Sequence, residues 1–121
     1  MTFPIQVTFR GMQTSEALEA EVRSKAQDLE KYFDRILNCR TTVEAPSKHH
    51  RHGQHFHVTV ELSVPGHELV ASRGEGLGHE DPGLAIRDAF RAAKSELQRH
   101  VGRIREQEKH GPRITDELSG S

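Results

Sequence analysis

Residues 54–72, QHFHVTVELSVPGHELVAS, decide how the rest of the chain can fold. In residues 56–64 apolar and polar side chains alternate, which predicts a β-strand with one buried and one solvent-exposed face. Pro65-Gly66 interrupts this run and a second short run follows over residues 68–72, so the segment predicts an antiparallel hairpin. Because Pro-Gly prefers a type II turn, which suits a two-residue hairpin loop poorly, we expect a slightly longer loop or a bulge near Gly66-His67.

The other elements follow from the same kind of pattern. Residues 3–9 and 36–44 also alternate and predict two further strands. Apolar residues recur every three or four positions in residues 15–33 and 82–109, which predicts two amphipathic helices. Thr14 or Ser15 is the expected N-cap of the first helix, and Asp81 caps the second with Pro82 in its first turn.

The order β-α-β-β-β-α predicts an α+β fold. A helix that joins two strands is a crossover, so we expect the first two strands to be parallel or nearly adjacent, and the last three can form a meander. The economical arrangement is a four-stranded sheet with both helices packed on one face. Residues 1–109 are expected to form this domain, and Gly111-Pro112 to end the second helix and leave residues 110–121 as a disordered tail.

The composition describes a small, highly charged protein. Its 121 residues are 33% apolar and 29% charged and include no Trp, which predicts one domain with a thin core. No apolar run is long enough for a membrane span or a signal peptide, so we expect a cytoplasmic protein without membrane binding. The single cysteine, Cys39, excludes an internal disulfide and, in an alternating strand, predicts a buried, inert thiol.

The formal net charge of −1 argues against nucleic-acid binding, but the charge is uneven. Residues 83–109 hold seven Lys or Arg against four acids, whereas residues 15–35 hold four against six. Three cations of the second helix recur at i, i+4 and i+7, namely Arg87, Arg91 and Lys94. This stripe is either a solvated face with intrahelical pairs such as Arg99 with Glu96, which periodicity alone favours, or a row of fixed cations for a phosphate backbone.

Histidines cluster in residues 49–57, HHRHGQHFH. Such a stretch can ligate zinc or nickel, but it holds no Cys and lies in a loop, so we favour a solvated loop or a polyanion contact and expect no metal. His55 and His57 fall on the polar side of the central strand, where they could touch RNA. The chain has no dinucleotide-binding glycine motif, Walker loop or nucleophile elbow, so we expect no cofactor and no catalytic residues.

Three stretches resemble, in this order, the ribosome hibernation-promoting factor and ribosome-associated inhibitor family. They are LEKYFDRI at 29–36, VPGHELVA at 64–71, and HED at 79–81 followed by AIRDAF at 85–90. The resemblance covers about residues 3–105 and includes the order of the elements. Some relatives are described as modulators of an alternative sigma factor.

The resemblance implies a protein that binds the ribosomal RNA of the small ribosomal subunit. We expect no DNA binding, and the oligomeric state stays open, with a monomer favoured. Family members occupy the channel of messenger and transfer RNA and block translation under stress, and their fold is similar to a double-stranded RNA-binding domain. The RNA-contact role carries over to Lys25, Lys31 and Arg35, and through the Ala-Ile segment to Arg87 and Arg91. With the cations and histidines suggested by the pattern, the candidate RNA-binding residues are Arg23, Lys25, Lys31, Arg35, His55, His57, Arg87, Arg91, Lys94 and Arg99.

Two features depart from the family's pattern. Many relatives carry a dense basic run at the end of the second helix, which Ala92, Ala93, Val101 and Gly102 dilute here. Longer relatives add a C-terminal dimerisation domain, for which this chain is too short. Two alternatives to ribosome binding stay open: a metal-responsive or protein-binding module that uses the His-rich loop, and a regulator of an alternative sigma factor.

Overall fold

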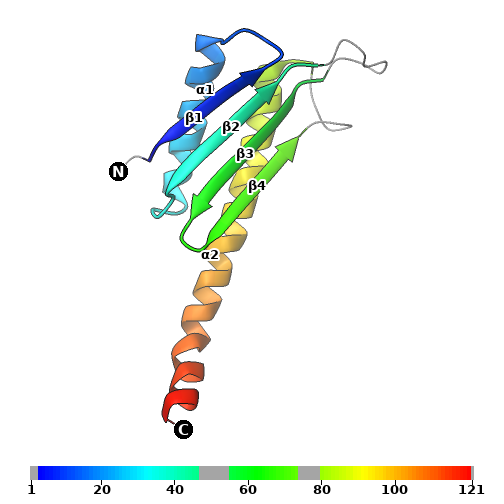
Figure 1. Ribbon diagram of the computed structural model, residues 1–121. Helices are drawn as coiled ribbons and strands as arrows, with labels where there is room; N and C mark the ends of the chain where they lie inside the picture. The colour runs from blue at the N-terminus through cyan, green and yellow to red at the C-terminus, as the bar shows by residue number, and fades with distance from the viewer. Residues whose placement is uncertain (1–2, 47–54, 74–79, 121) are drawn as a thin grey trace.

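The elements occur in the predicted order. The structure, a computed structural model, describes residues 3–46, 55–73 and 80–120. Its strands are β1 (Ile5–Arg10), β2 (Asn38–Glu44), β3 (His57–Val64) and β4 (His67–Arg73), and its helices are α1 (Glu16–Asp28), the short 3₁₀ helix η1 (Leu29–Lys31) and α2 (Pro82–Gly120). Figure 1 shows the sheet as one layer and the helices as a second layer behind it.

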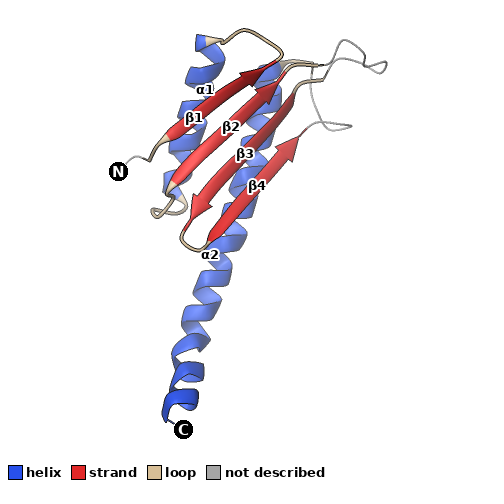
Figure 2. Cartoon of the chain, viewed as in Figure 1, coloured by secondary structure: helices blue, strands red, loops and turns tan. Residues whose placement is uncertain are grey.

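The sheet has the topology that the crossover argument predicts. Its strand order is β1-β2-β3-β4, with β1 parallel to β2 and the other two pairs antiparallel. Both helices cover the same face of the sheet, and the other face is open (Figure 2). The predicted α+β fold is therefore confirmed.

The core lies between the sheet and the two helices. The inward side chains of β3, among them Val58, Val60 and Leu62, are at most 2% exposed, as the alternation in residues 56–64 predicts. Ile86 and Leu97 of α2 are equally buried in the same cluster. Because each fully buried side chain of this size contributes about 1.5–3 kcal/mol, the helices are held on this face by hydrophobic burial.

Polar caps fix where the helices begin. The Ser15 hydroxyl oxygen accepts a hydrogen bond from the Leu18 N–H at 3.2 Å, and the Asp81 carboxylate accepts one from the Gly83 N–H at 2.9 Å. Each bond satisfies a backbone donor that has no partner within the first helical turn. Ser15 and Asp81 are therefore the N-terminal caps that the sequence predicts.

The turn between β3 and β4 differs from the prediction. Val64 pairs directly with His67, so the loop has only the two residues Pro65 and Gly66, and the expected longer loop or bulge is absent. Gly66 has a φ of 78°, and a side chain added there would meet nothing within 4 Å. The proline ring sets the first φ of the turn and the glycine supplies the positive second φ, so Pro-Gly closes the hairpin without an extra residue.

Two element boundaries also differ from the prediction. The first helix is α-helical only to Asp28 and continues as η1, although Leu29 and Phe33 are both buried as the apolar spacing predicts. The second strand begins at Asn38 rather than at residue 36, and Leu37 is 54% exposed rather than aligned with the buried side of β2. Alternation gives the face of a residue only inside the strand, so the pattern does not hold at Leu37.

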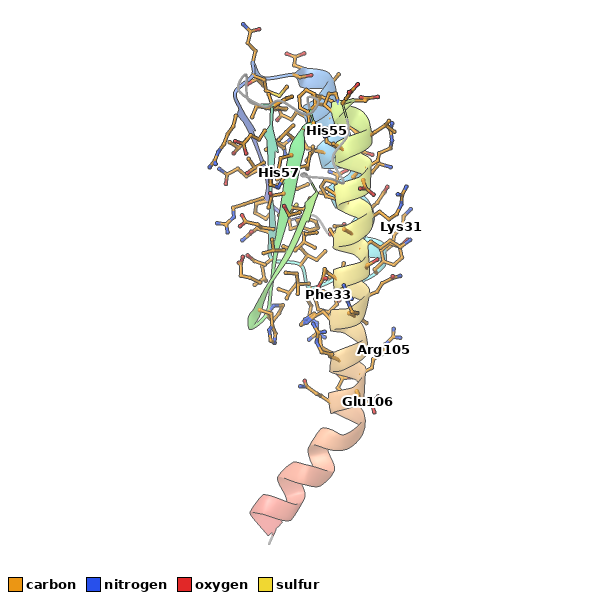
Figure 3. The ribbon with its side chains drawn as sticks, turned by 90° about the vertical axis from the view of Figure 1, so that its right-hand side faces the viewer. Lys31, Phe33, His55, His57, Arg105 and Glu106 are labelled. Atoms are coloured by element: carbon orange, nitrogen blue, oxygen red, sulfur yellow. The ribbon has the colours of Figure 1, made fainter. Side chains whose placement is uncertain are left out.

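The prediction that the second helix ends after Lys109 is wrong. The helix passes Gly111 and Pro112 and reaches Gly120, whereas the disorder expected of residues 110–121 stays a prediction. A proline removes one backbone donor from a helix and often bends it, and Figure 3 shows the axis of α2 bending in its last part. The domain boundary at residue 109 stays a prediction.

One histidine belongs to the core although the sequence gives it no role. His100 of α2 is 3% exposed, and its ring packs edge-on against Phe33 at 5.6 Å and against His67 at 5.2 Å between centroids. Within the described residues its Nε2 atom has no hydrogen-bond partner. Burial lowers the pKa of His100 below its ordinary value, and the nearby His67, Arg103 and Arg35 lower it further.

The lowered pKa of His100 predicts that acid destabilises the fold. Near and below the ordinary pKa of 6.5, the unfolded chain binds more protons at this residue than the folded chain does, because folding lowers the pKa of His100. The free energy of unfolding therefore falls with falling pH, by up to about 1.4 kcal/mol per pH unit. We expect His100→Phe, which keeps a ring but cannot titrate, to reduce this loss in urea unfolding between about pH 7.5 and about pH 5.5.

The control for this measurement is Leu84→Ala, at an exposed apolar position, which removes no titratable group and should keep the pH dependence of the unsubstituted protein. An equal loss of stability in the His100→Phe variant and the unsubstituted protein would contradict the prediction.

The cysteine is buried, as predicted. Cys39 is fully buried in β2, and its sulfur lies 3.6 Å from the Thr41 hydroxyl. Burial raises the pKa of the Cys39 thiol to about 11, although the Thr41 hydrogen bond acts in the opposite direction. The thiolate, which is the reactive form, is therefore scarce at neutral pH.

Thiol titration with an aromatic disulfide reagent should show this protection. At about pH 8 we expect no colour on the time scale of minutes from the folded protein, and one thiol per chain in concentrated guanidinium chloride. Rapid reaction of the folded protein would place Cys39 nearer to solvent than the structure does.

Candidate nucleic-acid interface

A basic groove runs between α1 and α2 on the side of the helices away from the core. It has a volume of about 260 Å³ and is lined by Lys25, Asp28, Leu29, Tyr32, Arg87, Phe90, Arg91 and Lys94. We refer to these eight residues as the interhelical groove. Four of the ten candidate RNA-binding residues lie together here, from segments far apart in the sequence: Lys25, Arg87, Arg91 and Lys94.

Helical periodicity explains why these side chains meet. On α1, Lys25 follows the buried Val22 by three positions and precedes the buried Ala26 by one, so it flanks the apolar stripe. On α2, Arg87 and Arg91 directly follow the buried Ile86 and Phe90. Because both stripes face the same side of one sheet and the helices lie side by side, these flanks face each other.

Each arginine of the groove forms a weak ion pair with a carboxylate. Arg87 Nη1 lies 2.8 Å from Glu21 Oε2 and so joins α2 to α1. Arg91 Nη1 lies 3.3 Å from Asp88 Oδ1, and the Arg91 side chain is 76% exposed. Exposed pairs of this kind contribute at most about 1 kcal/mol, so a phosphate could replace the carboxylate. Among the described residues no ion pair or hydrogen bond involves the Lys25 side chain.

An aromatic ring that is not among the predicted site residues forms part of the groove. The Lys94 ammonium lies 4.8 Å from the centroid of the Tyr32 ring, in a cation–π contact. Tyr32 is 37% exposed although its neighbour Phe33 is buried. One feature of the sequence could have identified Tyr32 as a site residue. It is the only tyrosine of the chain, and it lies off the apolar stripe of the first helix and next to Lys31.

Lys31 lies beside the groove, whereas Arg23 is engaged elsewhere. Lys31 Nζ is 4.0 Å from Asp28 Oδ1 and its side chain is 74% exposed, on the helical side of the molecule in Figure 3. The guanidinium of Arg23 donates to Glu19 at 3.0 and 3.1 Å and to the carbonyl oxygen of Ile5 at 3.0 Å. Arg23 therefore ties α1 to β1 and is directed away from α2.

Two more candidate cations lie outside the groove. The Arg35 guanidinium packs 5.3 Å from the centroid of Phe33, near His100. Arg99 pairs with Glu96 on its own helix, which is the intrahelical pair that periodicity favours. Arg99 also lines a separate depression of about 380 Å³ between α2 and β4. The structure does not bring either residue to the groove.

The open face of the sheet is polar, and its charges are largely paired. Arg40 lies 3.4 Å from Glu61 and 3.7 Å from Glu68. His57 Nε2 lies 2.6 Å from the Ser72 hydroxyl on this face, and the exposed His55 precedes β3. Figure 3 shows His57 on the sheet and Lys31 on the helical side, so these two candidates do not share a surface. A role of the histidines in RNA binding stays a prediction.

Only residues 55–57 of the His-rich stretch are described. Its residues 49–54 lie outside the described residues, as does most of the glycine-rich connection before α2. In the described parts of the chain, no group of three or more His, Cys, Asp or Glu side chains is arranged to hold a metal ion. Within the same residues, no helix is long and apolar enough to span a membrane.

Comparison with known proteins gives a family for residues 5–105. A model of the Sigma 54 modulation protein / S30EA ribosomal protein family matches residues 5–105. No curated protein matches the sequence. Two solved structures show the same fold at low sequence identity.

The first of these structures is a ribosomal subunit interface protein from Coxiella burnetii, with 18% identity and a TM-score of 0.69. The second is the N-terminal domain of Protein Y from Thermus thermophilus, with 17% identity and a TM-score of 0.65. Each alignment covers 83% of this chain and 99% of the other. From the family match and the shared fold we conclude that the chain belongs to the Sigma 54 modulation protein / S30EA ribosomal protein family, a family of ribosome-associated proteins.

Proposed function

We propose that the protein binds ribosomal RNA of the small ribosomal subunit through the interhelical groove and inhibits translation by occupying the channel of messenger and transfer RNA. The observation that carries this proposal is the convergence of Lys25, Arg87, Arg91 and Lys94 at one groove in a chain of this family. The name of the Coxiella burnetii structure, a ribosomal subunit interface protein, supports a site between the subunits.

Local charge, rather than net charge, supports the binding step. The protein as a whole carries −1, but the four cations of the groove face three carboxylates, Asp28 in the lining and Glu21 and Asp88 in ion pairs with Arg87 and Arg91, so the local balance is one positive charge. Fixed cations release counterions from a phosphate backbone when they bind it, which gives affinity without base recognition. The carboxylates that pair with Arg87 and Arg91 hold both guanidinium groups near the groove in the free protein.

The shape of the body supports inhibition by occlusion. The helices are fixed on the sheet by a continuous core, so the groove is part of one rigid layer. The 39 residues of α2 correspond to roughly 58 Å of helix at 1.5 Å per residue, and Figure 1 shows that α2 extends well beyond the sheet. A body of this length fills a channel sterically and needs no catalytic group.

Charge reversal in the groove tests the proposal. We expect the double variant Lys25→Glu and Arg91→Glu to bind purified small subunits on the order of 100-fold more weakly, because two charge-assisted contacts to phosphate are lost. The logarithm of the affinity decreases linearly with the logarithm of the salt concentration, and the magnitude of this slope should be smaller by about 2 in the variant. Co-sedimentation over a range of salt concentrations measures both quantities.

The matched control is Arg10→Glu with Arg105→Glu, two exposed positions outside the groove with the same change in net charge. This control should bind almost as tightly as the unsubstituted protein. Equal binding by both double variants would refute the groove as the site. If the unsubstituted protein binds subunits but does not inhibit translation in a cell-free assay, the occlusion mechanism is refuted instead.

A further inference from the structure

We infer that the interhelical groove accepts a single unpaired nucleotide, with its base against Tyr32, rather than the surface of an RNA duplex. This inference rests on the proposed function and specifies the form of RNA that the site takes. It concerns Tyr32 together with the cations on either side of it, Lys25, Arg91 and Lys94.

The dimensions of the groove favour one nucleotide. Its volume of about 260 Å³ lies just below the range of about 300–1,000 Å³ that is typical of small-molecule sites. From Arg87 to Lys94 the cations cover seven steps of α2, or roughly 10 Å. A double-stranded RNA-binding domain instead contacts about 16 base pairs. A duplex can therefore only rest on the rim of this groove, whereas one base can enter it.

The chemistry of the lining favours a base over a phosphate alone. Leu29 and Phe90 are buried at the floor of the groove, and Tyr32 presents a partly exposed ring at its wall. Unpaired bases stack on aromatic rings without regard to sequence, and single-stranded RNA is commonly recognised in this way. A site for phosphate alone would need the cations but not the ring.

The contact between Lys94 and Tyr32 fits this use. With no RNA present, the Lys94 ammonium covers the ring at 4.8 Å from its centroid. An arriving base would displace the ammonium from the ring, and the flexible lysine would then reach the phosphate of the same nucleotide. Lys25 and Arg91 flank the same groove and supply charge for the adjacent phosphate.

Binding of a short single-stranded RNA and of its blunt duplex tests the inference. We expect the single strand to bind more tightly, and Tyr32→Ala to weaken single-strand binding by about tenfold without changing duplex binding. Tyr32→Phe keeps the ring and should bind as the unsubstituted protein does, whereas Tyr32→Leu keeps apolar bulk and should bind weakly. Leu84→Ala, an exposed apolar position outside the groove, is the control for truncation.

A second readout observes the ring directly. Because Tyr32 is the only tyrosine, tyrosine-selective isotope labelling gives one set of ring resonances, which should move upfield when single-stranded RNA is added but not when duplex is added. Tighter binding of the duplex, an unchanged ring signal, or equal effects of Tyr32→Ala on both RNAs would overturn the inference.

The failure of this inference and that of the proposed function can be told apart. If Lys25→Glu with Arg91→Glu abolishes subunit binding while the Tyr32 ring does not respond to single-stranded RNA, the groove binds the ribosome but takes no unpaired base. If that double variant still binds subunits normally, the proposed function fails whatever the free RNA does.

Discussion

The burial of one face of a four-stranded sheet beneath two helices is the constraint on which the rest of the structure depends. Val58, Val60 and Leu62 in the central strand β3 must be covered, and one helix with a narrow apolar stripe cannot cover a sheet of four strands. The two helices therefore lie side by side on the same face. Their polar flanks then face each other, and the interhelical groove is a direct consequence of how the core is covered.

The same packing sorts the cations of the chain into two groups. One group lies outside the groove: Arg23 binds Glu19 and a carbonyl of β1, and Arg40 lies between two glutamates. The other group gathers in the interhelical groove around a tyrosine ring. For this reason the net charge of −1 says little about the partner, because an approaching polyanion responds to the local field of the groove.

Most of the fold can be predicted from local pattern, and the errors occur where local pattern is weak. The strands, the helices, their order and the caps at Ser15 and Asp81 follow from periodicity and side-chain chemistry. The Pro65-Gly66 turn and the continuation of α2 past Pro112 do not, because the preferences of proline and glycine are averages over many proteins and do not fix the backbone at one position. The burial of His100 could not be predicted from the sequence either, since a histidine on a helix is ordinarily exposed.

The sequence by itself determined which side of each strand and helix is apolar, and with it the two-layer architecture and the identity of the cations. Only the tertiary structure decided which of these cations share a surface, and that Tyr32 lies among them. The physical reason is that periodicity fixes the direction of a side chain about the axis of its own helix. The position of that axis relative to another helix depends on non-local packing against the sheet, which no single segment encodes.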